Sequence, residues 1–166
     1  MTLQTGMMLL AAKMPLDMMI SKMSEGMVET LKIFFLTLLF SLPLGLVIAF
    51  GRMAKNRIIR YIVTVYIAIM RGTPLMLQVM AIYFGPNYLL HIRIPRSYRF
   101  IAIIVAFALN YAAYFAEIYR SGIESMPVGQ YEAARLLGYN KAQTFFKIIL
   151  PQVIKRILPS ITNEVI

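Results

Sequence analysis

The residues best suited to bind a ligand are charged or polar side chains set within long apolar segments. A charge inside a membrane is costly, and it usually faces a cavity or a partner. Arg71 lies between two uncharged stretches and directly precedes Gly72-Thr73-Pro74, where a proline can open the helix backbone. A guanidinium in such a place can hold a carboxylate through two parallel hydrogen bonds. We therefore treat Arg71 and Thr73 as candidate ligand-binding residues.

A second group of polar residues follows in the next apolar segment. Their spacings of three to four residues bring side chains together on one face of a helix. The group comprises Asn110, Tyr111, Tyr114, Glu117 and Arg120. They could line a path for a polar solute. Alternatively, Glu117 and Arg120 form a local ion pair three residues apart, and Arg71 pairs with an acid elsewhere in the helix bundle. The residues alone leave both interpretations open.

The composition argues against a soluble protein and against catalysis. Of 166 residues, 60% are hydrophobic and only 14% are charged, which leaves too little polar surface for a soluble domain. There is no cysteine and a single histidine, His91, so we expect neither a metal site nor a catalytic residue. A membrane-bound enzyme would need clustered histidines, cysteines or paired carboxylates. The formal charge of +10 fits either nucleic-acid binding or basic membrane loops, and its position between apolar runs favours the loops.

The apolar runs predict an all-α integral membrane protein. Residues 33–51, 72–90 and 100–116 carry no formal charge, and about 20 such residues cross a bilayer. We expect spans at about residues 27–51, 58–90 and 99–119, and the start of another at 151–166. Residues 1–26 are interpreted as an interfacial amphipathic lead-in. As one straight helix, residues 58–90 would be roughly 50 Å long. That segment must therefore be tilted, extend past the membrane or break at residues 72–74.

Charge sets the expected orientation, because positively charged loops stay in the cytoplasm. Residues 1–32 carry three lysines and three acids, whereas residues 52–60 carry four basic residues and no acid. Residues 120–156 carry six basic residues and two acids. The N-terminus is therefore expected outside, and the loop at 120–150 inside. The three arginines at residues 93–99 would lie outside, against this rule.

The predicted cytoplasmic loop has the sequence of a helix, a sharp turn and a second helix. Pro127 suits a first helical turn, and Gly138 can end that helix in a left-handed conformation. Asn140 can cap the next helix, with Gln143 completing a capping box. An apolar face is then expected from Ala142, Phe145, Phe146, Ile149 and Leu150, and Pro151 is expected to end or kink this helix. A plain re-entry turn between spans remains the alternative.

Seven residues of this loop also match a known pattern. Glu132-Ala133-Ala134, Gly138, Ile148, Leu150 and Pro151 resemble the "EAA" loop of bacterial ABC importer permeases. "MRGTPLMLQ" at residues 70–78 and "AAYFAEIYRSGIESMPVGQYEAA" at residues 112–134 are similar to the polar amino-acid uptake branch. The resemblance covers roughly residues 27–166. It implies a multi-pass protein of the bacterial cytoplasmic (inner) membrane with a type I ABC importer helix bundle.

The resemblance also implies a function and partners. The loop would couple the permease to a cytoplasmic ATPase through Gly129, Gln130, Glu132, Ala133, Ala134, Gly138, Ile148, Leu150 and Pro151. ATP would be bound by that ATPase, so this subunit would bind no cofactor. A periplasmic or lipid-anchored substrate-binding protein and a second permease subunit would complete the transporter. Arg71 would then hold the carboxylate of an amino acid, and Glu117 its ammonium group.

The chain departs from the family at its C-terminus. It ends at Ile166, within the segment that follows Pro159, whereas family members continue through further membrane helices. We therefore expect a bundle that is incomplete at the C-terminus. The alternatives to an amino-acid permease are a truncated fragment or anchor that docks an ATPase without transporting, and a permease for another small solute.

The orientation is tested by placing single cysteines in the cysteine-free chain. With Lys22→Cys outside and Lys141→Cys inside, a membrane-impermeant thiol reagent should label only position 22 in intact cells. Both positions should be labelled after the membrane is opened. Labelling of position 141, and not of 22, in intact cells would reverse the predicted topology.

Overall fold

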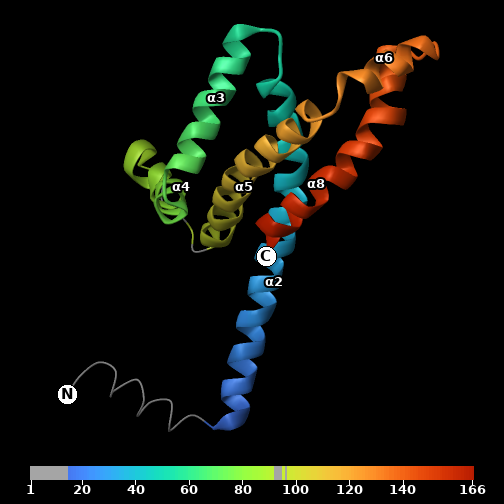
Figure 1. Ribbon diagram of the computed structural model, residues 1–166. Helices are drawn as coiled ribbons and strands as arrows, with labels where there is room; N and C mark the ends of the chain where they lie inside the picture. Colours follow the sequence, from blue (N-terminus) through green and yellow to red (C-terminus); the bar gives the residue numbers. More distant parts are fainter. Residues whose placement is uncertain (1–14, 92–94, 96) are drawn as a thin grey trace. The chain divides into compact units, whose positions relative to one another are not determined.

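A computed structural model describes residues 15–91, 95 and 97–166, and the regular structure in these ranges is entirely helical (Figure 1). The expectation of an all-α fold is therefore confirmed for the described residues. α2 (Leu16–Arg52) and α5 (Tyr98–Glu124) are long and apolar enough to cross a membrane. The bent pair α3 (Arg57–Gly72) and α4 (Leu75–Leu90) adds a third span if it counts as one crossing. Of the expected lead-in at residues 1–26, residues 1–14 lie outside the described residues.

The first described helix, α2 (Leu16–Arg52), runs without interruption through position 26, where we expected a boundary. The charges at residues 17–32 do not break it, because charged side chains are compatible with a helix and Lys32 pairs with Glu29 at 3.1 Å. By its internal contacts the chain divides into two compact units, one ending at Leu36 and one running from Thr37 to Ile166. The described part of the first unit, residues 15–36, is a single helical stretch with exposed apolar side chains, including Leu16 and Met23.

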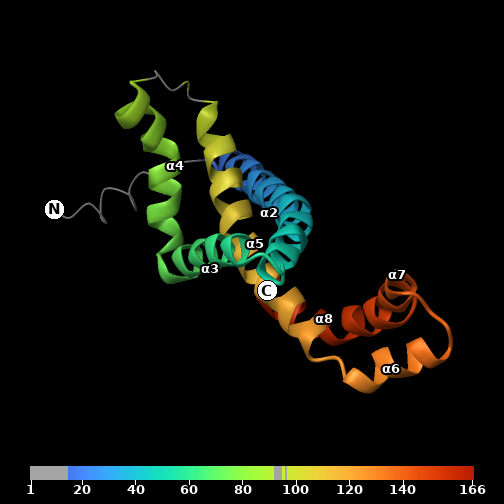
Figure 2. The same ribbon diagram turned by 90° about the horizontal axis from the view of Figure 1, so that it is seen from above.

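The second unit contains a sharp break between α3 (Arg57–Gly72) and α4 (Leu75–Leu90). The two helices meet at 109°, with Thr73 and Pro74 between them (Figure 2). Pro74 disfavours the helical conformation of the residue before it, and Thr73 is extended at φ −116° and ψ 144°. Of the three possibilities for residues 58–90, the structure therefore has the break.

The long helix α5 (Tyr98–Glu124) packs against α3 and α4 and carries the core of the second unit. Its buried side is rich in alanine, and Ala113 and Ala116 pack with Ala49 of α2 and Ile67 of α3. At Gly45 of α2, an added Cβ would lie 2.8 Å from the Cβ of Phe115. Small residues thus let these backbones approach closely, which is a common way for helices to associate in membranes.

The chain beyond α5 folds back along it. α6 (Val128–Leu136) and α7 (Lys141–Gln143) lead into the π-helical segment η1 (Thr144–Ile149) and then α8 (Leu150–Val165), which packs on α5 (Figure 2). Met126, Ile149, Val153 and Ile157 form the core of this region. Gly122 marks the close crossing of α5 and α8, because an added Cβ would overlap Cγ2 of Ile157.

We expect Gly122→Ala to destabilise the protein, because Ile157 is β-branched and has few rotamers with which to make room. Overpacking of this kind costs about 1–3 kcal/mol of unfolding free energy, and the thermal midpoint in detergent should fall. Removing the obstacle in Gly122→Ala/Ile157→Ala should recover part of that loss. Gly85→Ala is the matched control, since a Cβ there meets nothing within 4 Å. Equal midpoints for Gly122→Ala and Gly85→Ala would mean that α5 and α8 do not cross as closely as described.

Candidate functional site

The loop after α5 is built around a left-handed residue. Gly138 has φ +80°, which confirms the expected glycine cap. Its N–H donates to Arg135 O, and the N–H of Tyr139 donates to Ala134 O, both at 3.0 Å. This pair of bonds is the Schellman motif, which satisfies the last carbonyls of a helix and reverses the chain. Glycine reaches this conformation without strain, so the exit angle of α6 depends on this residue.

The helix that follows the turn begins at a full capping box. Asn140 Oδ1 accepts the N–H of Gln143 at 2.8 Å, and Gln143 Oε1 accepts the N–H of Asn140 at 3.0 Å. The sequence prediction at Asn140 and Gln143 is therefore confirmed. Pro127, expected within the first turn of α6, is the residue just before it. Both ends of the reversal between α6 and α7 are thus fixed by local hydrogen bonds.

The predicted apolar face after Asn140 is partly wrong. Residues 144–149 form a π-helix, and the N–H of Leu150 bonds to Phe145 O, five residues back. The buried residues are accordingly Thr144, Ile149, Val153 and Ile157, at steps of five, four and four. Ala142 is exposed and so is Phe146, which the regular helical period placed inside. The wide turn rotates every following side chain relative to that expectation.

Pro151 does not end the helical stretch, which was one of the two outcomes that we expected. It lies in the first turn of α8, where its missing N–H would otherwise break the hydrogen-bond ladder of a continuous α-helix. The change from π-helix to α-helix directly before Pro151 places it at a position where a helix tolerates proline. The sequence motif around Ile148, Leu150 and Pro151 therefore marks a change of helical pitch. No period-based argument would have revealed this.

The surface of α6 carries apolar and charged residues with no covering segment among the described residues. Leu136 is 90% exposed and Leu137 74% exposed, and Glu132 and Ala133 are also exposed. Ala134 differs, because it is buried and accepts a bond from the turn. Its small side chain therefore serves packing within the loop. Gly129 is exposed, and no atom lies within 4 Å of where its Cβ would be.

Two contacts fasten the loop to α8, and no sequence pattern predicted either of them. Arg156 Nη1 donates to Ser125 O at 2.7 Å and to Ser125 Oγ at 3.1 Å. Gln152 Nε2 donates to Gln130 Oε1 at 3.2 Å. The partners lie 31 and 22 residues apart in the sequence, so no local pattern connects them. Both ends of the segment from Ser125 to Gln130 are thereby tied to α8.

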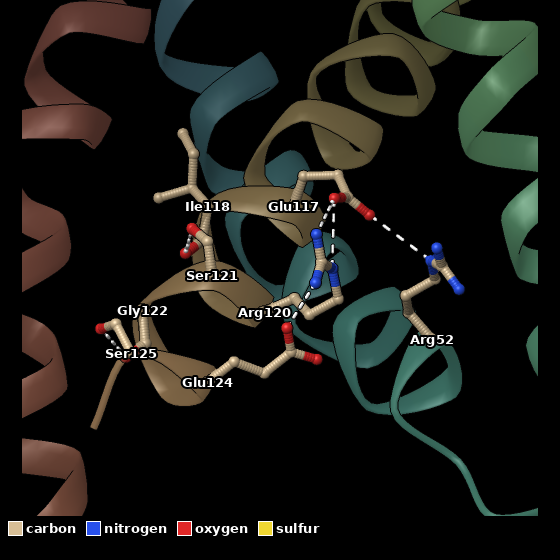
Figure 3. Close-up of polar contacts among 8 residues, drawn as sticks. All are labelled: Arg52, Glu117, Ile118, Arg120, Ser121, Gly122, Glu124 and Ser125. Carbon is tan, nitrogen blue, oxygen red and sulfur yellow. Dashed lines mark hydrogen bonds and ion pairs between the residues drawn. The ribbon is translucent and has the colours of Figure 1, made fainter. Parts of the chain in front are cut away.

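An ionic cluster lies near the C-terminal ends of α2 and α5. Arg120 Nη2 and Nε donate to Glu117 Oε2 at 2.6 and 3.1 Å, and Arg120 also pairs with Glu124 (Figure 3). Arg52 Nε of α2 lies 3.5 Å from the other carboxylate oxygen of Glu117. The local pair of Glu117 and Arg120, one of the two interpretations above, is thus present. The carboxylate joins the end of α2 to α5.

Arg71 occupies a different environment. Its guanidinium carbon is 5.1 Å from the centre of the Tyr114 ring, within reach of a cation–π interaction. Among the residues that the structure describes, no carboxylate oxygen lies within 4.0 Å of Arg71. Tyr111 lies next to Tyr114, with ring centres 6.4 Å apart. Arg71, Tyr111 and Tyr114 therefore gather at the junction of α3 with α5, whereas Glu117 and Arg120 belong to the ionic cluster.

Side-chain amides surround the break between α3 and α4. Asn110 Nδ2 donates to Met70 O at 2.9 Å and to Gln78 Oε1 at 3.0 Å. Gln78 Nε2 in turn lies within hydrogen-bond distance of Met70 O, Thr73 O and Thr73 Oγ1, at 2.9, 3.2 and 2.8 Å. Asn110 and Thr73 were candidates from the sequence, whereas Gln78 was not, although a glutamine within an uncharged stretch could have indicated it.

These features define a multi-helix membrane protein with a polar junction among its helices and a structured loop at one end of α5. The family profile for the binding-protein-dependent transport system inner membrane component matches residues 41–166. This chain belongs to that family.

Individual relatives agree with this assignment. The chain is 42% identical over 142 residues to the "Putative glutamine transport system permease protein GlnP" of Rickettsia bellii. It is 41% identical over 142 residues to the arginine transport system permease protein ArtQ of Bacillus subtilis. Each alignment covers 86% of this chain and 64% of the relative, so the chain spans just under two thirds of the length of these proteins.

A solved structure gives the same result for the fold. The crystal structure of an amino acid ABC transporter with histidines is similar to this chain at a TM-score of 0.76 and 37% identity. The match covers 92% of this chain and 71% of that one. The helix bundle of this chain is therefore that of an ABC transporter permease, as the resemblance implied.

Proposed function

We propose that this chain is the permease subunit of an ATP-driven importer for amino acids. The observation that carries the proposal is the loop at residues 125–151, where a left-handed glycine and a capping box hold an otherwise uncovered helix, α6, at a fixed angle. A chain that is mostly apolar gains nothing from such a structure unless something binds it. The names of the relatives supply the class of transporter.

The partner of α6 in this proposal is a cytoplasmic ATPase subunit. The exposed Leu136 and Leu137 offer apolar contact, and the exposed Glu132 offers a charge for a basic residue of the ATPase. ATP is bound by that ATPase, and this chain contributes no cofactor-binding or catalytic residue. A substrate-binding protein outside the membrane and a second permease subunit complete the assembly.

Motion of α6 would reach the membrane helices through the contacts that fasten the loop. The bonds from Gln152 to Gln130 and from Arg156 to Ser125 connect α6 and its approach to α8. The buried cluster around Ile149 and Val153 connects α8 to the end of α5. A push on α6 would therefore displace α5 and α8 together. This is how a nucleotide-driven change in the ATPase would select between two arrangements of the bundle.

The proposed solute path runs past Arg71, Thr73, Tyr111 and Tyr114. The guanidinium carbon of Arg71 lies 5.1 Å from the centre of the Tyr114 ring, and no described carboxylate pairs with Arg71, so its N–H groups could hold the carboxylate of a solute. The carboxylate of Glu117 lies near two arginines, so we assign Glu117 and Arg120 to joining α2 and α5. Arg71 is the residue of this chain that would recognise an amino-acid carboxylate.

The loop proposal is tested at Gly138. Gly138→Val should uncouple the transporter, since a β-branched residue in the left-handed conformation costs about 1 kcal/mol or more and would change the exit angle of α6. The assay is substrate-stimulated ATP hydrolysis and uptake by the complex reconstituted with its ATPase and substrate-binding protein. Gly138→Asn should retain most coupling, because asparagine visits this conformation more readily. Glu132→Ala should show a milder defect than Gly138→Val.

The control for bulk is Gly85→Val, a helical glycine with open space around its Cβ. It should couple as the wild type does. Wild-type coupling in Gly138→Val would reduce the loop to a turn between spans. ATPase binding without any uptake by the wild-type chain would favour a docking anchor over a permease. Uptake of a solute that is not an amino acid would replace the proposed substrate class.

The solute path is tested at Arg71. We expect Arg71→Lys to raise the solute concentration needed for half-maximal uptake about tenfold, since an ammonium group cannot reproduce the bidentate fork and a lost charged hydrogen bond is worth about 1.5–3 kcal/mol. Arg57→Lys at the start of α3 is the matched control and should be neutral. Unchanged half-saturation in Arg71→Ala would remove Arg71 from the path.

A further inference from the structure

We propose that Gln78 and Asn110 form an amide clasp that holds the break between α3 and α4 and thereby positions Arg71. Neither residue is assigned a contact with solute. Both act on Arg71 through the backbone of residues 70–74. The clasp itself depends only on the geometry below, whereas its consequence for uptake rests on the function proposed above.

The clasp supplies hydrogen-bond donors to a backbone carbonyl that lacks its helical partner. In a continuous helix the carbonyl of Met70 would accept the N–H of the residue four positions on, but that residue is Pro74, which has no N–H. In apolar surroundings an unpaired carbonyl is costly. Asn110 Nδ2 and Gln78 Nε2 each lie 2.9 Å from Met70 O. Two side-chain amides thus replace the donor that Pro74 lacks.

The same amides connect three helices. Gln78, in the first turn of α4, reaches back across the break to Thr73 O and Thr73 Oγ1, and its own Oε1 accepts from Asn110 of α5. Asn110 is only 6% exposed and its two bonds are partly buried, whereas Thr73 lies at the exposed side of the break. A straightened or differently bent α3–α4 pair would move Gln78 away from Met70 and Thr73. The clasp therefore favours the 109° bend over other angles.

The clasp also sets the place of Arg71. Arg71 directly follows Met70, and Tyr114 lies one helical turn beyond Asn110 on α5. The bond from Asn110 to Met70 O and the contact of Arg71 with Tyr114 therefore fix the same register between the end of α3 and α5. Asn110, which the sequence suggested as a solute contact, donates to Met70 O and Gln78 Oε1 within this network. The geometry assigns Asn110 and Gln78 to positioning and leaves recognition to Arg71.

The bend is measured with two spin labels, because the chain has no cysteine of its own. Cysteines replace Tyr61 on α3 and Tyr88 on α4, which are 71% and 80% exposed. The complete chain is placed in lipid bilayers, and the distance between the labels is recorded by pulsed electron paramagnetic resonance. The wild-type background should give one narrow distance peak. Gln78→Leu and Asn110→Leu, which keep size but lose the amide, should each raise the population outside that peak roughly tenfold.

Two further variants make the measurement specific. Gln78→Leu/Asn110→Leu should broaden the distances little more than either single change, because both residues serve one clasp. Thr64→Val is the matched control: it removes the bond from Thr64 Oγ1 to Arg60 O, which stays within α3, and should leave the peak unchanged. An unchanged peak in both leucine variants would overturn the clasp, and so would equal broadening in Thr64→Val.

Uptake by the assembled transporter tests the positioning of Arg71. Gln78→Leu should raise the half-saturating solute concentration about tenfold while changing the maximal rate much less, since it displaces the recognising group. In the double variant Gln78→Leu/Arg71→Lys, the half-saturating solute concentration should be little higher than in Arg71→Lys alone. A fall in maximal rate alone would overturn the positioning role. If the wild-type chain moves no amino acid, the proposed function fails, and the label distances still decide on the clasp.

Discussion

Backbone hydrogen bonding in apolar surroundings is the constraint on which this structure depends. In lipid, every N–H and C=O must find a partner within the protein, so each interruption of a helix needs a local remedy. Three of the interruptions among the described residues show this, and each is satisfied in a different way. Side-chain amides from Gln78 and Asn110 replace the donor missing at Pro74. A Schellman turn at Gly138 satisfies the end of α6, and a π-helical segment precedes Pro151. Each of these three places carries a residue to which we assign a function.

Close packing of small residues is the second determinant, because it lets α5 serve as a common support. Apolar side chains gain little by leaving lipid for a protein interior, so van der Waals contact between close backbones must hold the helices together. Gly45 of α2 lies close to the backbone of α5, and Gly122 of α5 lies close to Ile157 of α8. These two close contacts lie on either side of Glu117 along α5. α5 is therefore held along its length by α2, α3 and α8, and it carries both the loop and the polar junction.

The part of this structure that could be predicted from sequence is the part whose causes are local. Gly138, Asn140 and Gln143 act over three or four residues, and their conformations follow from residue type. The break at Pro74 was one of the three possibilities for residues 58–90, and it too follows from the type of a local residue. The π-helical turn was missed because it keeps the hydrophobic composition and changes only the period, and Phe146 was misplaced with it. Gln78, Arg52 and Arg156 were missed because each has a partner 31 residues or more away. Gln78 also has nearby partners, Met70 and Thr73, across the break.

The loop and the polar junction are connected by one unbroken helix, and this limits how they can influence each other. Asn110 and Gly122 are twelve residues apart on α5, about 18 Å at 1.5 Å per residue. No proline interrupts α5 between them, so this stretch has no obvious place to absorb a displacement. A shift of α8 at Gly122 would therefore reach Asn110 and Tyr114 as a movement of the whole helix. The end of α3 is attached to both residues, through Met70 O and through Arg71. If α5 moves as a rigid body, either the break between α3 and α4 moves with it or the hydrogen bonds of the amide clasp are lost. Either outcome would couple the loop to the solute path.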